Sequence, residues 1–148
     1  MKLKVLLIED DYLQRKSVKK ALERELDAEV ITKSDEYEFV RDFEQIAEDP
    51  PHVAVIDNML RWASPAREIP DPPNEATAKH PENGGVRCGQ RLMQDARTSH
   101  VRRIAYSVLG KEDLDSGTVL PDSTLLIVKE HDIHNLIDEV KKMKVMTS

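Results

Sequence analysis

A short apolar run ends abruptly in an acidic residue at Asp57, in the sequence VAVID. The run has no polar alternation, which predicts a strand buried on both faces, as in a parallel sheet. The residue that ends such a strand lies at the carboxyl edge of the sheet, where open α/β sheets bind ligands. Aspartate also follows many strands only to begin a turn, so the weight of Asp57 depends on which other residues reach the same edge.

Four further apolar runs alternate with helical patterns along the chain. Strands are predicted at residues 3–8, 29–33, 53–57, 103–107 and 124–129. Amphipathic helices are predicted over residues 12–26, from a Ser34 cap to Asp49, around 88–96 and over 133–143, with at most a short helix within 110–123. This alternation predicts right-handed crossovers and an α/β fold, a doubly wound parallel sheet with helices on both faces.

The composition narrows the class of protein. At 148 residues the chain is long enough for one domain with a real core, and we expect a single domain over residues 1–148. No apolar run could span a bilayer, and the N-terminus is unlike a signal peptide, so we expect a cytoplasmic protein with no membrane contact. The lone Cys88 permits no internal disulfide and is expected in the core. The net charge of −6 argues against a nucleic-acid surface, which needs a basic patch.

Four of the five predicted strands end in chemically useful residues: Glu9 and Asp10 after the first, Asp57 after the third, Ser107 after the fourth and Lys129 after the fifth. Because parallel strands end at one edge, we expect these side chains to lie together. Three carboxylates there would repel one another unless a cation lay among them. Oxygen ligands without His or Cys suit Mg²⁺, and a nearby lysine and hydroxyl complete a site for a phosphoryl group.

From residue 4 through its last helix, the chain resembles the receiver domain of two-component response regulators. The match is by position: Glu9 and Asp10 match the acidic metal-binding pair, Asp57 the phosphoacceptor, Met59 the residue whose backbone carbonyl binds the metal, Ser107 the switch hydroxyl and Lys129 the invariant lysine. The resemblance implies the flavodoxin-like fold, a five-stranded parallel sheet of order 2-1-3-4-5.

The resemblance also implies a mechanism. Asp57 would accept a phosphoryl group from the phosphohistidine of a histidine kinase or a histidine phosphotransfer protein, with Mg²⁺ or Mn²⁺ as the cofactor. The phosphoaspartate would then attract Ser107 and Lys129 and shift a pre-existing equilibrium on the adjoining surface. The protein would be a stand-alone response regulator that catalyses its own phosphotransfer and dephosphorylation, is not an independent turnover enzyme, and signals by binding a downstream protein or by forming a homodimer.

Two other functions share part of this residue pattern. A receiver-fold interaction module that acts without phosphorylation is favoured by the departures described next and opposed by the intact set of polar residues. A phosphohydrolase of the haloacid dehalogenase type would need a second aspartate two residues after the first, and this chain has Met59 there. The second alternative is therefore disfavoured, and the first stays open.

Four positions depart from the family pattern, and one of them is Val108, which follows Ser107 where a small residue is usual. Glu130 follows the lysine where proline is usual, and a cis bond before a non-proline residue costs roughly 3 kcal/mol, so we expect a trans bond here. Arg61 replaces another common proline, four residues after Asp57. Leu126 stands where an aromatic residue usually couples to the switch hydroxyl, and Tyr106 beside Ser107 is a candidate substitute.

The chain also carries a proline-rich insertion at about residues 61–84, between the third strand and the third helix. Five of the eight prolines fall in it, and it shows no periodicity, which predicts a long loop. Two interpretations stay open. It could be a surface excursion without fixed structure. It could instead be a lid over the site or a docking element for a kinase, because it begins close to Asp57 and carries the only tryptophan, Trp62.

The bulk around the predicted phosphoacceptor suggests a long-lived phosphoryl group. Met59 and Val108 flank the site in sequence, with Leu109 beyond, and their side chains should hinder an attacking water. We therefore predict slow hydrolysis of the phosphoaspartate, measured by the loss of radiolabel from the phosphorylated protein after removal of the donor. A half-life of seconds would contradict this prediction.

Overall fold

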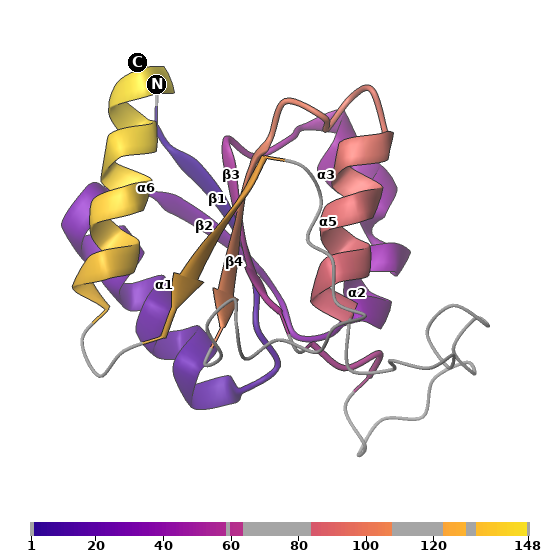
Figure 1. The fold of residues 1–148 in the computed structure, drawn as a ribbon, viewed down its shortest axis with the longest axis horizontal. Coiled ribbons are helices and arrows are strands. Elements are labelled where there is room, and N and C mark those ends of the chain that lie inside the picture. Colours follow the sequence, from indigo (N-terminus) through magenta and orange to yellow (C-terminus); the bar gives the residue numbers. More distant parts are fainter. Residues whose placement is uncertain (1, 59, 64–83, 108–122, 130–132, 148) are drawn as a thin grey trace.

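The computed structural model describes residues 2–58, 60–63, 84–107, 123–129 and 133–147. Five strands form one parallel sheet in the order β2-β1-β3-β4-β5 (Figure 1). They are β1 (Lys4–Ile8), β2 (Glu29–Lys33), β3 (Val53–Asp57), β4 (Arg102–Ser107) and β5 (Thr124–Val128). The predicted flavodoxin-like order is confirmed, and each strand begins and ends within one residue of its predicted bounds.

Helices cover both faces of the sheet. The helices α1 (Tyr12–Leu26) and α6 (His134–Thr147) lie on one face, whereas α2 (Glu36–Arg41), α3 (Phe43–Glu48) and α5 (Gly84–Gln94) lie on the other (Figure 1). Alternate strand residues supply the two cores, so Leu7 packs beneath α1 and α6 while Leu6 packs beneath α3 and α5. The predicted short helix within 110–123 falls almost wholly outside the described residues. Among the described helices, none is long and apolar enough to cross a bilayer.

The second predicted helix needs correction at its start and its middle. Its cap is Asp35, not Ser34, because the Asp35 carboxylate accepts the hydrogen bond from the Glu38 N–H at 2.8 Å. Ser34 instead donates from its N–H and its hydroxyl to the Glu38 carboxylate. The helix is also interrupted at Asp42, which separates α2 from α3 and whose carboxylate is held by Lys33 at 2.7 Å. Aspartate favours caps and turns over helix interiors, which accounts for both changes.

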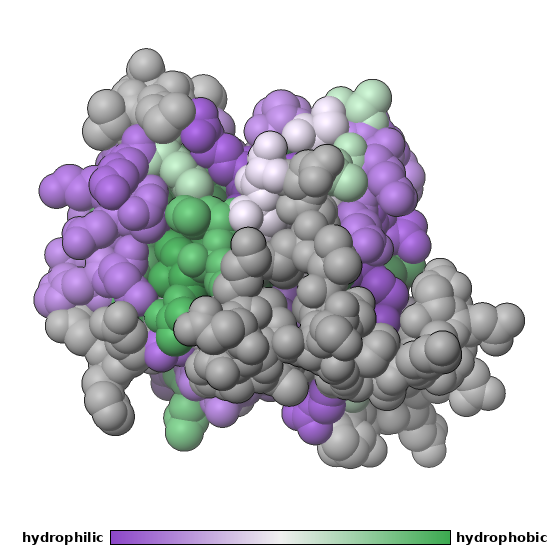
Figure 2. All heavy atoms as spheres, in the orientation of Figure 1, coloured by the Kyte–Doolittle hydropathy of each residue, from purple (hydrophilic) through white to green (hydrophobic). Residues whose placement is uncertain are grey.

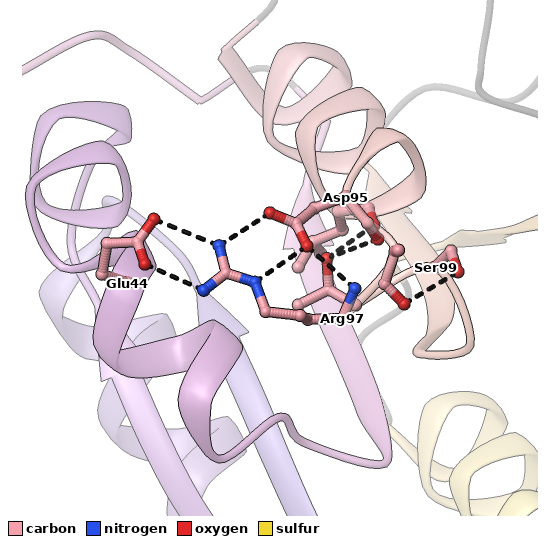
Figure 3. Close-up of polar contacts among 7 residues, drawn as sticks. Glu44, Asp95, Arg97 and Ser99 are labelled. Carbon is pink, nitrogen blue, oxygen red and sulfur yellow. Dashed lines mark hydrogen bonds and ion pairs between the residues drawn. The ribbon is translucent and has the colours of Figure 1, made fainter.

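An exposed ion-pair network joins α3 to the turn that follows α5. Arg97 donates to Glu44 at 2.9 Å and to Asp95 at 2.9 Å, while Ser99 in the same turn donates to the carbonyl of Ala96 (Figure 3). Hydrogen bonds from Arg97 lower the pKa of Asp95 to about 2 and also lower the pKa of Glu44, which favours the charged form of both carboxylates. Because these groups are exposed, the network orients the turn more than it stabilises the fold.

The buried position of Cys88 provides a test of the packing of α5. Its side chain is 1% exposed, as the sequence predicts, and burial, together with the nearby charge of Glu36, raises the pKa of its thiol well above the usual range. We therefore expect no alkylation by iodoacetamide in the folded protein at mildly alkaline pH and complete alkylation in concentrated urea, both measured by intact mass. Rapid alkylation without urea would mean that α5 does not pack as described.

Candidate functional site

Three carboxylates converge at the carboxyl edge of β1 and β3. Glu9 and Asp10 directly follow β1, and Asp57 is the last residue of β3. One carboxylate oxygen from each of the three lies within 4.8 Å of the others. Glu9 and Asp57 are buried and Asp10 is half-buried. An all-oxygen cluster of this size suits a hard divalent cation such as Mg²⁺, so the donor set fits the predicted metal site.

The acidic segment after β1 is held rigidly by its own hydrogen bonds. The Glu9 N–H donates to the carbonyl of Lys33 at the end of β2, at 3.1 Å. The Glu9 carboxylate accepts a hydrogen bond from the Asp11 N–H at 3.2 Å. The backbone carbonyl of Glu9 accepts one from the Arg15 guanidinium at 2.7 Å. Asp11 then caps α1 by accepting from the Gln14 N–H at 3.1 Å. These bonds fix where the Glu9 and Asp10 side chains leave the chain.

The last two strands bring a lysine and a hydroxyl to the same edge. The Lys129 ammonium lies 2.9 Å from the Glu9 carboxylate and 3.8 Å from that of Asp57. The Lys129 N–H donates to the carbonyl of Ser107, whose side chain is fully buried at the end of β4. The structure therefore places Glu9, Asp10, Asp57 and Lys129 close together and Ser107 at the same edge of the sheet, bound to Lys129 through its backbone. Met59 lies outside the described residues.

Tyr106 and Leu126 occupy different surroundings. The Tyr106 ring is buried in the core beneath α1 and α6, and its centroid lies 5.5 Å from the Lys129 ammonium. Leu126 is half-buried on β5. The Tyr106 ring thus contacts the Lys129 ammonium, and this contact is one route by which the ring would be coupled to the site.

Sequence reasoning missed a second cation in the site. The Arg61 guanidinium donates from Nε to the Asp10 carboxylate at 3.1 Å. The Arg61 side chain is 53% exposed, and that of Asp10 is 19% exposed. The sequence marked Arg61 only as a departure from the family pattern. Its position four residues after Asp57 indicated that it could lie near the site. Its actual place depends on the path of the backbone after β3, which the sequence does not predict.

That backbone path is set by hydrogen bonds to two helices. Three successive carbonyls accept from the first residues of α5 and α2: Leu60 from Gly84 at 2.9 Å, Arg61 from Glu36 at 3.0 Å and Trp62 from Tyr37 at 2.8 Å. The Trp62 ring also meets the Tyr37 ring edge-on, with centroids 5.8 Å apart. The beginning of the predicted insertion is therefore bound to α2, and Trp62 packs against that helix; residues 64–83 lie outside the described residues.

The start of α5 is anchored by a buried ion pair as well. Arg87 donates two hydrogen bonds of 2.9 Å to the Glu36 carboxylate, and both side chains are largely buried. Since Glu36 also binds the carbonyl of Arg61, one residue of α2 joins the segment after β3 to α5. Beside this pair, a cavity of about 400 Å³ opens between α2, α3 and α5.

Gly85 lets α5 approach the backbone of Asp57. A Cβ atom at Gly85 would lie 2.0 Å from the Asp57 carbonyl oxygen, a distance that backbone atoms cannot accept without moving. The helix therefore begins earlier than predicted, at Gly84, because its first residues have no side chains to hold it away from β3.

The Gly85→Ala substitution tests this contact. Overpacking should cost about 1–3 kcal/mol of the free energy of unfolding, measured by urea denaturation. Alanine is intrinsically the better helix former by about 1 kcal/mol, so a net loss would report the clash with Asp57. Gln90→Ala, at an exposed position of the same helix, is the matched control and should change stability little. A Gly85→Ala protein at least as stable as the parent would contradict the described approach.

Comparisons with known proteins agree with this architecture at the level of the fold. No family model matches the chain, and no curated protein matches it. Solved structures do match over nearly the whole chain, and they are receiver domains of response regulators and sensor kinases. The chain thus has the receiver-domain fold that its sequence predicts.

Three of these structures illustrate the likeness. A signal receiver domain from Clostridium thermocellum is 16% identical, with a TM-score of 0.65 and coverage of 97% of this chain and 98% of that one. The response regulator TrrA from Thermotoga maritima, in complex with Mg²⁺ and a beryllium fluoride, is 18% identical, with a TM-score of 0.62 and coverage of 97% and 99%. The receiver domain of a Pseudomonas aeruginosa sensor histidine kinase, with magnesium in its active-site cleft, is 14% identical, with a TM-score of 0.62 and coverage of 97% and 98%.

Proposed function

We propose that the protein is a single receiver domain of the stand-alone response regulator type, which accepts a phosphoryl group on Asp57. The observation that carries this proposal is the convergence of Glu9, Asp10, Asp57, Ser107 and Lys129 at one edge of a receiver-type sheet. The donor would be a phosphohistidine of a histidine kinase or a histidine phosphotransfer protein. The proposal keeps the cytoplasmic location that the sequence predicts, and the protein would act on itself as a phosphoacceptor without independent turnover.

Glu9, Asp10 and Asp57 would hold the divalent cation, with the carbonyl of Met59 as a further ligand. When bound, Mg²⁺ or Mn²⁺ supplies positive charge that offsets the charge of the transferring phosphoryl group. Two supports for this assignment are the oxygen-only donor set and the magnesium described for TrrA and for the Pseudomonas receiver domain.

Three residues of the chain would take part in the phosphoryl transfer itself. An Asp57 carboxylate oxygen forms the bond to phosphorus, in line with the phosphorus–nitrogen bond of the donor, whose electron pair returns to the imidazole. The Lys129 ammonium, 3.8 Å from Asp57, is close enough to turn from the carboxylates to a phosphoryl oxygen. The Ser107 hydroxyl would then donate to another phosphoryl oxygen, which draws the end of β4 toward the site.

The output would be contact with another protein. Edge strand β5 exposes Leu125 and Val128, each 39% accessible, and a hydrophobic band runs over this strand in Figure 2. Exposed apolar side chains on an edge strand favour association with a partner, here a downstream target or a second copy of the chain. Because Lys129 directly follows β5, the partner surface begins one residue from the site.

One observation favours the alternative of an interaction module that works without phosphorylation. All three carboxylates of the cluster have a cationic partner within the described part of the chain: Lys129 pairs with Glu9 and, at 3.8 Å, with Asp57, and Arg61 pairs with Asp10. Two cations offset part of the repulsion among the three carboxylates, so the cluster depends less on a metal ion. A single phosphorylation assay distinguishes the phosphoacceptor from the interaction module.

We expect one added phosphoryl group in the intact mass after incubation with acetyl phosphate or phosphoramidate and Mg²⁺. The addition should disappear in Asp57→Asn and when the metal is chelated, because the acceptor or the charge that offsets the phosphoryl group is then missing. Asp138→Asn is the matched control, since Asp138 is an exposed residue of α6 and is not part of the acidic cluster. No mass gain with any donor, together with no Mg²⁺ binding, would favour the interaction module.

A further inference from the structure

A second cation, Arg61, lies beside the acidic cluster in addition to the predicted Lys129. Lys129 lies on the Glu9 side of the cluster, and Arg61 lies on the Asp10 side, 3.1 Å from its carboxylate. Asp10 is the most exposed of the three carboxylates that could hold a metal. Arg61 therefore lies on the solvent-exposed side of the cluster.

The backbone holds Arg61 at this place. Its carbonyl accepts from the Glu36 N–H at the start of α2, and the carbonyls on either side of it are bound as well. Glu36 is itself fixed by its buried pair with Arg87. The guanidinium therefore reaches Asp10 from an anchored residue, and little backbone entropy is lost when the pair forms.

We propose that Arg61 is a built-in counter-ion of Asp10 that lowers the affinity of the acidic cluster for divalent cations. This rests on the metal site of the proposed function. Arg61 acts through Asp10 and is a positioning residue: it neutralises the carboxylate when no metal is bound and must turn away, or share Asp10, when a cation binds. A second effect follows, because the neutralised cluster costs the metal-free protein less repulsion.

The size of the effect follows from the exposure of the pair. A guanidinium near a metal-binding carboxylate opposes a dication, but water and salt screen a half-exposed charge. Removing Arg61 should therefore tighten Mg²⁺ binding by about three- to tenfold, and this gain should shrink as the salt concentration rises.

The first test is calorimetric titration with Mg²⁺, and separately with Mn²⁺, of the full chain and its variants. Arg61→Ala and Arg61→Gln should bind more tightly than the parent, whereas Arg61→Lys, which keeps the charge, should bind nearly as the parent does. Arg24→Ala is the matched control: it removes the same charge from an exposed residue in the last turn of α1 and should leave the affinity unchanged.

Thermal unfolding with and without Mg²⁺ gives a readout that a merely structural role would not move. With the metal chelated, Arg61→Ala should have a lower Tm than the parent, because the cluster has lost a counter-ion. On adding Mg²⁺ its Tm should rise further than the parent's, since tighter binding stabilises the folded state more. A purely structural loss would lower the Tm by the same amount in both conditions.

The possible failures are distinguishable. Equal or weaker metal affinity in Arg61→Ala, with binding to the parent intact, would overturn the role of Arg61 and leave the proposed metal site standing. No binding of either metal to the parent or to any variant would overturn the metal site and this inference together. Binding seen only after Arg61 is removed would support the inference in its strongest form.

Discussion

The repulsion among three carboxylates at the end of β1 and β3 is the constraint on which the rest of this site depends. Glu9 and Asp57 are buried, so their charges are poorly screened and need partners close by. Lys129 supplies one partner from the far end of the chain, and it reaches the cluster only because β5 lies parallel to β4 in correct register. The chain must therefore complete the whole sheet before the acidic cluster has its lysine.

The parts that could be predicted from the sequence are those that a buried parallel sheet imposes. Strands such as β3, apolar on both faces, are short and continuous in sequence, so their ends are sharply defined, and every parallel strand ends at the same edge. The strand positions predicted Asp57, Ser107 and Lys129 at one edge, and the order implied by the receiver resemblance put their three strands side by side. Here the topology, and not any individual motif, supports the prediction of the site.

The parts that could not be predicted depend on short-range choices between similar residues. Ser34 and Asp35 are both good caps, and only the position of the Glu38 N–H decides between them. The predicted helix, around residues 88–96, did not include Gly85, because the contribution of this glycine is the absence of a side chain beside Asp57. Arg61 sits in an irregular segment whose path depends on hydrogen bonds to α2, and propensity and periodicity carry no information about such bonds.

The same bonds make the acidic cluster a junction between two distant surfaces. On one side, Arg61 joins Asp10 to the start of α2 and, through Glu36, to α5. On the other, Lys129 joins Glu9 to the end of β5. A phosphoryl group on Asp57 would compete with Glu9 for Lys129, and the lysine N–H is bound to the carbonyl of Ser107. Any movement of the Lys129 backbone is therefore shared by the ends of β4 and β5, where the exposed apolar side chains begin.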